Sequence, residues 1–245
     1  MTCNLKNTIV LFALCFPIFI FGQIGSRLPS ERKAVVDPVT GVELIFLTSQ
    51  PEKGDCKIYP TQNQWTSDGQ WLIFRSDRIP DEAIAVHEET GDMVQVTEGG
   101  YFGTLAVSRK NMLLYYMRAV DDDGNPAPRR RREPQTAQIV EVDIDKLFAD
   151  SEAATLKNAS HYIRICGVVP ASIDATANLA LDANEEIAYF RVGREEAGRY
   201  IPAGTKIEEN FGPRNMGAGP GGIASMNLKT GELKHVISVP FQLGH

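Results

Sequence analysis

Short apolar runs separated by tight turns recur along this chain. The clearest example is the segment 65–77, in which Ser67-Asp68-Gly69 lies between two apolar runs. Asp-Gly supplies the positive-φ backbone positions that a tight turn needs, and apolar runs on both sides of such a turn are typical of paired strands. The segment therefore predicts a β-hairpin.

The hairpin belongs to a unit of four short strands that occurs three times. In the first unit, two more strands at 83–87 and 93–97 follow the hairpin and are joined by the turn 89–92. The other two units are predicted from the same alternation of strand and turn: 104–108, 112–117 and 137–144 in the second unit, and 178–182, 187–192, 223–228 and 233–239 in the third. One extra strand is expected at 42–48, and residues 24–38 are expected to be a lead-in without regular structure.

Repeated four-stranded units are typical of a β-propeller, in which each blade packs against the next and is not stable alone. A β-sandwich would not repeat the turn chemistry in every unit, and the coils of a β-solenoid are much shorter. Propellers close with roughly four to eight blades. The sequence therefore predicts an all-β chain that forms an incomplete N-terminal portion of a propeller, about three and a half blades long. Its last blade is expected to expose an unpaired edge and an apolar face, so the chain by itself is expected to be poorly stable or to associate.

Composition agrees with a folded domain. The 245 residues are 43% hydrophobic and 23% charged, and 25 basic against 31 acidic residues give a net charge of −6. This balance gives no support to a nucleic acid partner.

The N-terminus has the pattern of a cleaved secretory signal. Lys6 precedes an apolar run at 9–21, which is short for a membrane span and is followed by polar sequence. We therefore expect a signal peptide at 1–22 and a partial propeller domain at 23–245 that is periplasmic or secreted, with no membrane attachment after cleavage. Cys56 and Cys166 are the cysteines of this mature chain. Two widely spaced cysteines are compatible with a disulfide or with two small buried side chains.

Arginine is the candidate binding residue. Arg75, Arg118 and Arg191 end the second strand of the three units, so they are predicted to project toward one face. Guanidinium groups bind carboxylates in bidentate geometry, which suits an anionic ligand such as a uronate sugar. The alternative for each arginine is a solvated charge or an ion pair with a nearby acid. The run Arg129–Arg132, which lies between prolines, is expected to be a solvated loop.

Two later residues complete the set of candidates. Arg214 lies in the glycine-rich stretch 212–222, which does not follow a strand and open a helix as a phosphate-binding loop would. His245 lies where the next innermost strand should begin, so it is predicted to line the mouth of a central channel. No metal-ligand spacing, Ser/His/Asp set or Gly-x-Ser-x-Gly motif is present in the sequence.

Several of these stretches resemble one known family. They are the segments 37–41, 64–69, 212–217, 225–232 and 241–245. Together they resemble the oligogalacturonate lyases of polysaccharide lyase family 22, in their exported Bacteroidetes-like form. The hairpins alone are shared with TolB-type propellers, whereas the stretch from 212 to 245 is more specific.

The resemblance implies a seven-bladed propeller that cleaves short galacturonides by β-elimination in pectin degradation. A base removes the proton α to the uronate carboxylate, and manganese or another divalent metal binds that carboxylate. The family's histidine base and its metal-binding histidines and glutamine have no matching motif here, so no catalytic or metal-binding residue is assigned and the chain alone is expected to be inactive. His245 matches a family Leu-Gly-His and is given a cleft-lining role only.

Two other functions remain open at the level of the sequence. One is a TolB-like propeller that binds a protein or a glycan and carries out no chemistry. The other is the propeller of a prolyl-oligopeptidase-type protease. Histidines and a glutamine near later blade starts would favour the lyase, and a Gly-x-Ser-x-Gly motif would favour the peptidase.

Overall fold

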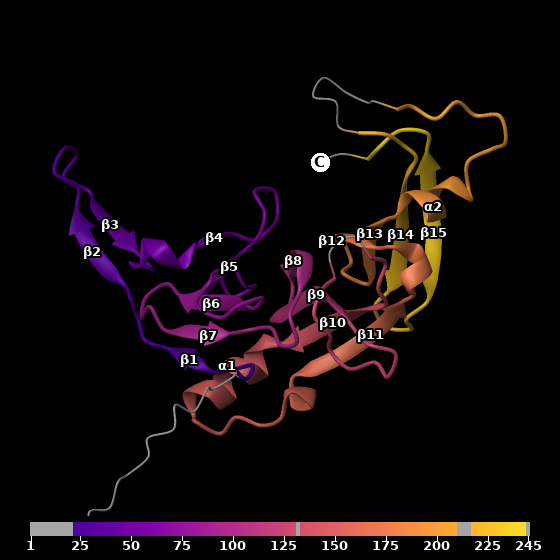
Figure 1. Cartoon of the computed structure of the whole chain (residues 1–245). Coiled ribbons are helices and arrows are strands. Elements are labelled where there is room, and N and C mark those ends of the chain that lie inside the picture. Colours follow the sequence, from indigo (N-terminus) through magenta and orange to yellow (C-terminus); the bar gives the residue numbers. More distant parts are fainter. Residues whose placement is uncertain (1–21, 131–132, 210–216, 244–245) are drawn as a thin grey trace, which may run out of the picture.

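The computed structural model describes residues 22–130, 133–209 and 217–243. All but the last residue of the predicted signal peptide lie outside these ranges. Within them, the structure is a curved row of mostly antiparallel strands that forms part of a propeller (Figure 1). No helix of the described residues is long and apolar enough to cross a membrane.

The first blade is a sheet with the order β1-β7-β6-β5-β4. Its strands are β1 (Arg27–Leu28), β4 (Cys56–Lys57), β5 (Trp71–Arg75), β6 (Ala83–His87) and β7 (Met93–Gln95). An isolated bridge between Trp65 and Leu72 places Trp65 beside β5, on the other side of the Ser67-Asp68-Gly69 turn. The predicted hairpin is therefore present.

The second and third blades share one eight-stranded sheet, because their innermost strands β8 and β12 meet in parallel at Thr104 and Asn178. The second blade contains β8 (Phe102–Val107), β9 (Leu113–Ala119), β10 (Ala137–Asp143) and β11 (Ile163–Val169). The third contains β12 (Thr176–Leu181), β13 (Ile187–Val192), β14 (Gly221–Asn227) and β15 (Leu233–Val239). The three predicted units are confirmed as three blades.

Short helices lie in several of the segments that connect the strands. Helix α1 (Ile144–Glu152) follows β10, and the Asp143 carboxylate caps it by accepting a hydrogen bond of 3.0 Å from the Lys146 N–H. Its buried residues Leu147 and Phe148 face the sheet. Helix α2 (Arg194–Gly198) follows β13, and three 3₁₀ turns lie at η1 (Pro51–Lys53), η2 (Ala159–His161) and η3 (Ala171–Ile173). Neither α1 nor strand β11 was predicted from the sequence.

The prediction for the N-terminal segment was wrong in part. Residues 24–38 contain β1 and a further strand, β2 (Lys33–Val36), and β2 pairs with β3 (Glu43–Phe46). The expected extra strand is therefore one half of a two-stranded hairpin. Four residues are too few to show an alternating pattern, and only the pairing across the turn 37–41 reveals β2 as a strand.

Three hairpin turns are built alike, at 37–41, 87–91 and 227–231. In each, the first side chain accepts hydrogen bonds from the backbone N–H groups two and three residues later. The glycine that ends each turn donates its N–H to the carbonyl of the first residue and has φ of 72–73°. Left-handed backbone of this kind favours glycine.

The core lies between the blades. One cluster joins Ile73 and Ala85 of the first blade to Leu105 and Tyr116 of the second, and all four side chains are fully or almost fully buried. A second cluster of the same kind lies between the second and third blades. It includes Met117, Leu179, Phe190 and Met226. Each described blade is therefore apolar on the face that meets its neighbour.

The outward face of the first blade is covered by the N-terminal segment. Ile84 and Met93 are fully buried there, and Leu28 and Leu47 pack against them. Leu47 directly follows β3, so the β2–β3 hairpin begins and ends at this covered face. The hairpin itself projects beyond the first blade (Figure 1).

An ion-pair cluster holds this segment in place. The Arg78 guanidinium donates to both carboxylate oxygens of Glu31, at 3.0 and 2.7 Å, and also binds Asp55 and Ser76. The Arg78 and Glu31 side chains are only 4% and 9% exposed. The hydrogen bonds from Arg78 lower the pKa of Glu31, although partial burial acts in the opposite direction. Glu31 also accepts the Ser49 N–H at 2.8 Å, so the cluster ties both ends of the hairpin to the first blade.

Replacing Arg78 with Met is expected to lower the free energy of unfolding by about 3 kcal/mol near neutral pH, because two largely buried carboxylates lose their partner. The stabilisation from Glu31 is present above its unfolded pKa of about 4.3 and is lost as the pH falls through its lower folded pKa. The difference between wild type and variant should therefore narrow in acid. Urea unfolding at several pH values measures it.

Arg27→Met is the matched control, because the Arg27–Asp92 pair is 34% and 43% exposed and should contribute less than about 1 kcal/mol. Equal losses from the two substitutions would show that the Arg78 cluster stabilises the fold no more than an exposed ion pair does.

The repeated turns allow a second comparison of stabilities. Gly41 and Gly91 have the same φ, but a Cβ at Gly41 would meet nothing, whereas a Cβ at Gly91 would clash with the Ser30 Oγ and the Arg32 Cβ. Gly41→Ala should cost about 1 kcal/mol from backbone strain, and Gly91→Ala clearly more. Urea unfolding gives the free energy of unfolding of both variants. Equal losses would contradict the prediction, because they would show that the added Cβ at position 91 costs no more than the one at position 41.

Candidate ligand-binding face

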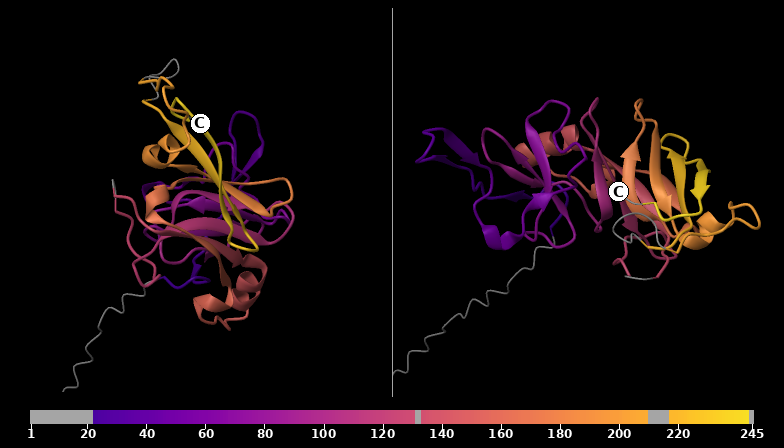
Figure 2. Two further views of the ribbon diagram at one scale, coloured as in Figure 1. Left: turned by 90° about the vertical axis from the view of Figure 1, so that its right-hand side faces the viewer. Right: turned by 90° about the horizontal axis from the view of Figure 1, so that it is seen from above.

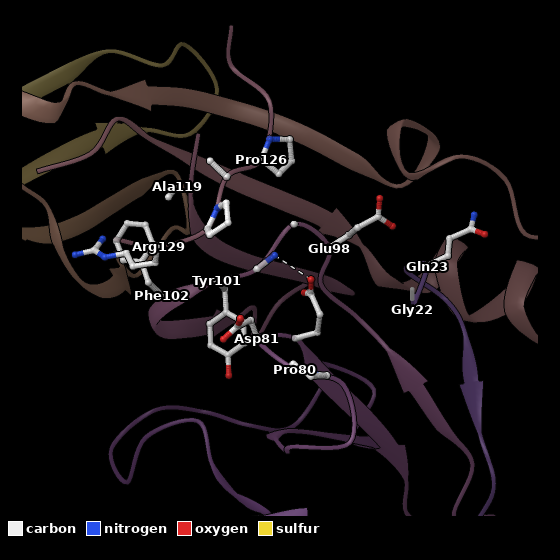
Figure 3. Close-up of a pocket in the computed structure, with 15 residues that line it drawn as sticks. Gly22, Gln23, Pro80, Asp81, Glu98, Tyr101, Phe102, Ala119, Pro126 and Arg129 are labelled. Carbon is white, nitrogen blue, oxygen red and sulfur yellow. Dashed lines mark hydrogen bonds between the residues drawn. The ribbon is translucent and has the colours of Figure 1, made fainter. Parts of the chain in front are cut away.

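Three hollows lie along one face of the described structure, where the second strands of the blades end. The first has a volume of about 770 Å³ and is lined by aromatic, acidic and basic side chains (Figure 3). These include Asp81, Glu98, Tyr101, Phe102 and Arg129. It lies where the first blade connects to the second, so residues of both blades and of their link form its walls.

Glu82 anchors the floor of this hollow. Its carboxylate accepts a 2.6 Å hydrogen bond from the Thr97 hydroxyl and a 2.9 Å bond from the Gly100 N–H. The Thr97 oxygen in turn accepts the Ala83 N–H at 2.8 Å. Burial raises the pKa of Glu82, and the charge of Glu98 acts in the same direction. Glu82 thus fixes the turn that presents Tyr101 to the hollow.

Arg129 is not the fully solvated loop residue that the sequence led us to expect. Its guanidinium lies 3.8 Å from the centre of the Phe102 ring, a cation–π contact at the wall of the first hollow. Loss of solvent at this position lowers the pKa of Arg129. Arg130 is exposed and forms a surface ion pair with Glu133, as a solvated loop would. Arg131 and Arg132 lie outside the described residues.

The second hollow, of about 330 Å³, contains the first of the predicted arginines. Arg75 lines it together with Cys56, and its Nε donates to the Lys57 carbonyl at 3.0 Å. Asp81, Glu82 and Tyr101 line both this hollow and the first one. The two hollows therefore lie on either side of a shared wall.

The third hollow, of about 360 Å³, contains Arg191 at the end of β13, with Arg194, Thr176 and Gln242 around it. The Arg191 guanidinium forms no hydrogen bond or ion pair with any part of the chain that the structure describes. Burial alone lowers its pKa, which means that its charge is partly desolvated without a compensating partner. A partly desolvated, unpaired guanidinium is a favourable position for an anion.

Arg118, the third arginine of the series, is occupied by the protein. Its Nε donates to the Gln138 side chain at 3.1 Å and its Nη1 donates to the Glu98 carbonyl at 3.2 Å. These bonds connect the second blade to the link that precedes it. The predicted binding role of Arg118 is not tested by this geometry, but the structure gives the residue a cross-linking role that the sequence did not show.

Electrostatics connect the hollows. Asp174 lines the third hollow, and its charge acts on Arg129 at the wall of the first. Arg129 shares the first hollow with Asp81 and Glu98, and Arg75 shares the second hollow with Asp81. Such a face can pair cations with ligand carboxylates and pair its own carboxylates with ligand hydroxyl groups.

Two candidate binding residues and the two cysteines of the predicted mature chain have not yet been placed. Arg214 and His245 lie outside the described residues, so their predicted roles stay predictions. Cys56 is exposed and Cys166 is buried, and both thiols are free. Cys166 therefore fits the expectation of a small buried side chain and Cys56 does not. Burial raises the pKa of Cys166 to about 12.

A manganese site, which the family resemblance implies, does not fit the described residues. None of their His, Cys, Asp and Glu side chains form a group of three or more that could hold a metal ion. Two carboxylates of the first hollow already have partners: Glu82 accepts from Thr97 and Gly100, and one oxygen of Glu98 accepts the Ile24 N–H at 2.8 Å.

Comparison with known proteins supports the fold. No protein-family model matches the sequence, and no curated protein gives a significant match. Among solved structures, an oligogalacturonate lyase in complex with manganese matches with a TM-score of 0.61 and 20% identity over 91% of this chain and 51% of that one. An oligogalacturonate lyase from Vibrio parahaemolyticus matches with a TM-score of 0.60 and 16% identity over 91% and 50%.

These likenesses concern the fold, since the identities are low. The chain spans about half the length of the lyase structures that it matches. The described blades thus have the propeller-like fold of part of an oligogalacturonate lyase.

Proposed function

We propose that this chain binds short galacturonate oligosaccharides on the face that carries the three hollows, and that it is part of an oligogalacturonate lyase that acts in pectin breakdown. The observation that carries the proposal is Arg191, a partly desolvated arginine without a partner among the described residues, in a hollow at the end of a blade strand. The fold of the two lyase structures supports the same ligand class.

The chemistry of the face suits such a ligand. Each galacturonate unit carries one carboxylate and several hydroxyl groups. Arg191 and Arg75 offer N–H donors to the carboxylates, and the carboxylates of Asp81 and Glu98 offer acceptors to hydroxyl groups. Tyr101 provides an aromatic surface in the shared wall of two hollows, against which the C–H face of a sugar ring can pack.

The role assigned to the described residues is binding and orientation. β-Elimination requires a base at the proton α to the carboxylate and stabilisation of the negative charge that develops there. Arg191 would neutralise part of a uronate charge and hold the sugar, and no described residue is assigned as the base. A metal ion, if the complete enzyme uses one, requires ligands other than the described residues.

The proposal includes export. Lys6 and the apolar run that follows it have the pattern of a secretory signal, and a periplasmic or secreted location would give the protein access to pectin fragments. The N-terminal sequence of the protein recovered from a secreting host tests this part. A protein that retains its first 22 residues in the cytoplasm contradicts it.

Arg191→Gln should weaken the binding of digalacturonate about tenfold or more, because it removes a charge-assisted contact while adding no steric clash. Isothermal titration calorimetry on the mature protein measures the change. Arg109→Gln is the matched control. Arg109 is exposed at the turn after β8, lines none of the three hollows, and its loss changes the net charge equally.

A neutral galactose disaccharide serves as the ligand control and should bind much more weakly than digalacturonate. If Arg191→Gln leaves the affinity unchanged, or if the neutral sugar binds equally well, the uronate proposal is wrong. Incubation of digalacturonate with the protein and manganese, followed by ultraviolet absorbance of an unsaturated product, reports separately whether the 245 residues carry out the elimination.

A further inference from the structure

The turn before the second strand is closed by the same backbone bond in all three blades. An N–H donates, at 3.0 Å, to the carbonyl of the residue five positions later, and the pairs are Thr66 and Trp71, Ser108 and Leu113, and Asp182 and Ile187. Each acceptor is the first residue of a second strand, β5, β9 or β13. Equivalent positions in these strands can therefore be counted from this bond.

The position four residues after the acceptor is arginine in the first and third blades and methionine in the second. Strand pairing gives the same equivalence. Each of the three residues lies opposite one residue of the innermost strand, and the pairs are Arg75 and Cys56, Met117 and Phe102, and Arg191 and Thr176. Arg75 and Arg191 thus occupy one structural position, which Met117 occupies in the second blade.

The second strand of the second blade presents no arginine at this position. Met117 is fully buried between the second and third blades. Arg118 is one position further along β9, and consecutive residues of a strand point to opposite faces. Its guanidinium is hydrogen-bonded within the protein. Neither residue places a guanidinium where Arg75 and Arg191 place theirs.

Arg129 supplies a guanidinium at this place from the segment after β9. The group lies 3.8 Å from the centre of the Phe102 ring, and Phe102 is the residue opposite Met117 (Figure 3). The Arg129 guanidinium forms no hydrogen bond or ion pair with the described residues, and loss of solvent lowers its pKa. The next residue, Arg130, pairs with Glu133 instead. Arg129 is thus unpaired in the same way as Arg191.

Arg129 lies at the junction between the second and third blades. Phe102 packs against the buried cluster between these blades, and the charge of Asp174, which precedes β12, acts on Arg129. Arg75 lies at the junction between the first and second blades, because Gly103 of β8 lines its hollow. The three blades follow one another along the row when seen from above (Figure 2). One guanidinium therefore lies at each of the two junctions whose blades are both described.

We propose that Arg129 is the uronate-binding arginine of the second blade, and that one oligogalacturonate crosses the face with different carboxylates on the guanidinium groups of neighbouring blades. This inference rests on the proposed function and adds chain-length selectivity to it. A galacturonate chain repeats one carboxylate per unit, and the face repeats one guanidinium per blade. Once one carboxylate is bound, the next contact of the same ligand is intramolecular, so a longer ligand binds more tightly.

Arg129→Gln should weaken the binding of trigalacturonate about tenfold, because one charge-assisted contact is lost. Galacturonate itself should lose less than about twofold, since a single carboxylate can bind at Arg75 or Arg191 instead. Isothermal titration calorimetry on the mature protein measures both affinities. The preference for the trimer over the monomer should therefore fall, which a general loss of structure would not produce.

Arg130→Gln is the matched control. Arg130 is the next residue of the same segment, its side chain is 73% exposed, and its loss changes the net charge equally. It should leave both affinities unchanged. Arg129→Lys keeps the charge without the planar guanidinium, so it should retain part of the trimer affinity. Circular dichroism and thermal melting establish that each variant is folded.

A loss of trimer affinity in Arg129→Gln, with Arg130→Gln unchanged, supports the inference. Wild-type trimer affinity in Arg129→Gln, or an equal loss in Arg130→Gln, overturns it. The proposed function is judged separately by Arg191→Gln. If Arg191→Gln weakens digalacturonate binding while Arg129→Gln leaves trimer binding unchanged, only the role of Arg129 is wrong. If the wild-type protein does not bind trigalacturonate, both proposals are wrong.

Discussion

The packing of one apolar sheet face against the next is the constraint on which this structure depends. The core does not lie inside any blade. It lies between blades: Tyr116 of the second blade shares one buried cluster with Ile73 of the first, and Met117 of the second shares another with Leu179 of the third. Because consecutive residues of a strand point to opposite faces, Tyr116 and Met117 serve different interfaces. A blade in such a row is stable only with its neighbours.

The same constraint determines where a ligand can bind. Since the faces of the sheets are used for packing, the strand ends and their connections remain free for side chains that carry function. The three hollows lie at these ends, and their walls come from links between blades as much as from the strands. Glu82 illustrates this, because its bonds to Thr97 and Gly100 fix a connection rather than a strand.

Two of the arginines stabilise the fold through polar contacts within the protein. Arg78 is buried with Glu31 and Asp55, and this cluster ties an otherwise exposed hairpin to the first blade. Arg118 likewise bridges Gln138 and the Glu98 carbonyl. Arg191 differs from both because no described residue pairs with it. Arg78, Arg118 and Arg191 each lie at or just beyond the end of a blade strand. The partners of each guanidinium group, or their absence among the described residues, determine whether it can stabilise the fold or bind a ligand.

The sequence alone determined the repeated unit, because apolar alternation and Asp-Gly or Thr-Gly turns are local properties of the chain. Strands such as Ala83–His87 and Leu233–Val239 were predicted with the bounds that the structure has. Only the tertiary structure decided which arginine is free, that Arg129 lies on Phe102, and that β2 is a strand. The physical reason is that pairing, burial and desolvation depend on residues far apart in the sequence, and no local pattern contains them.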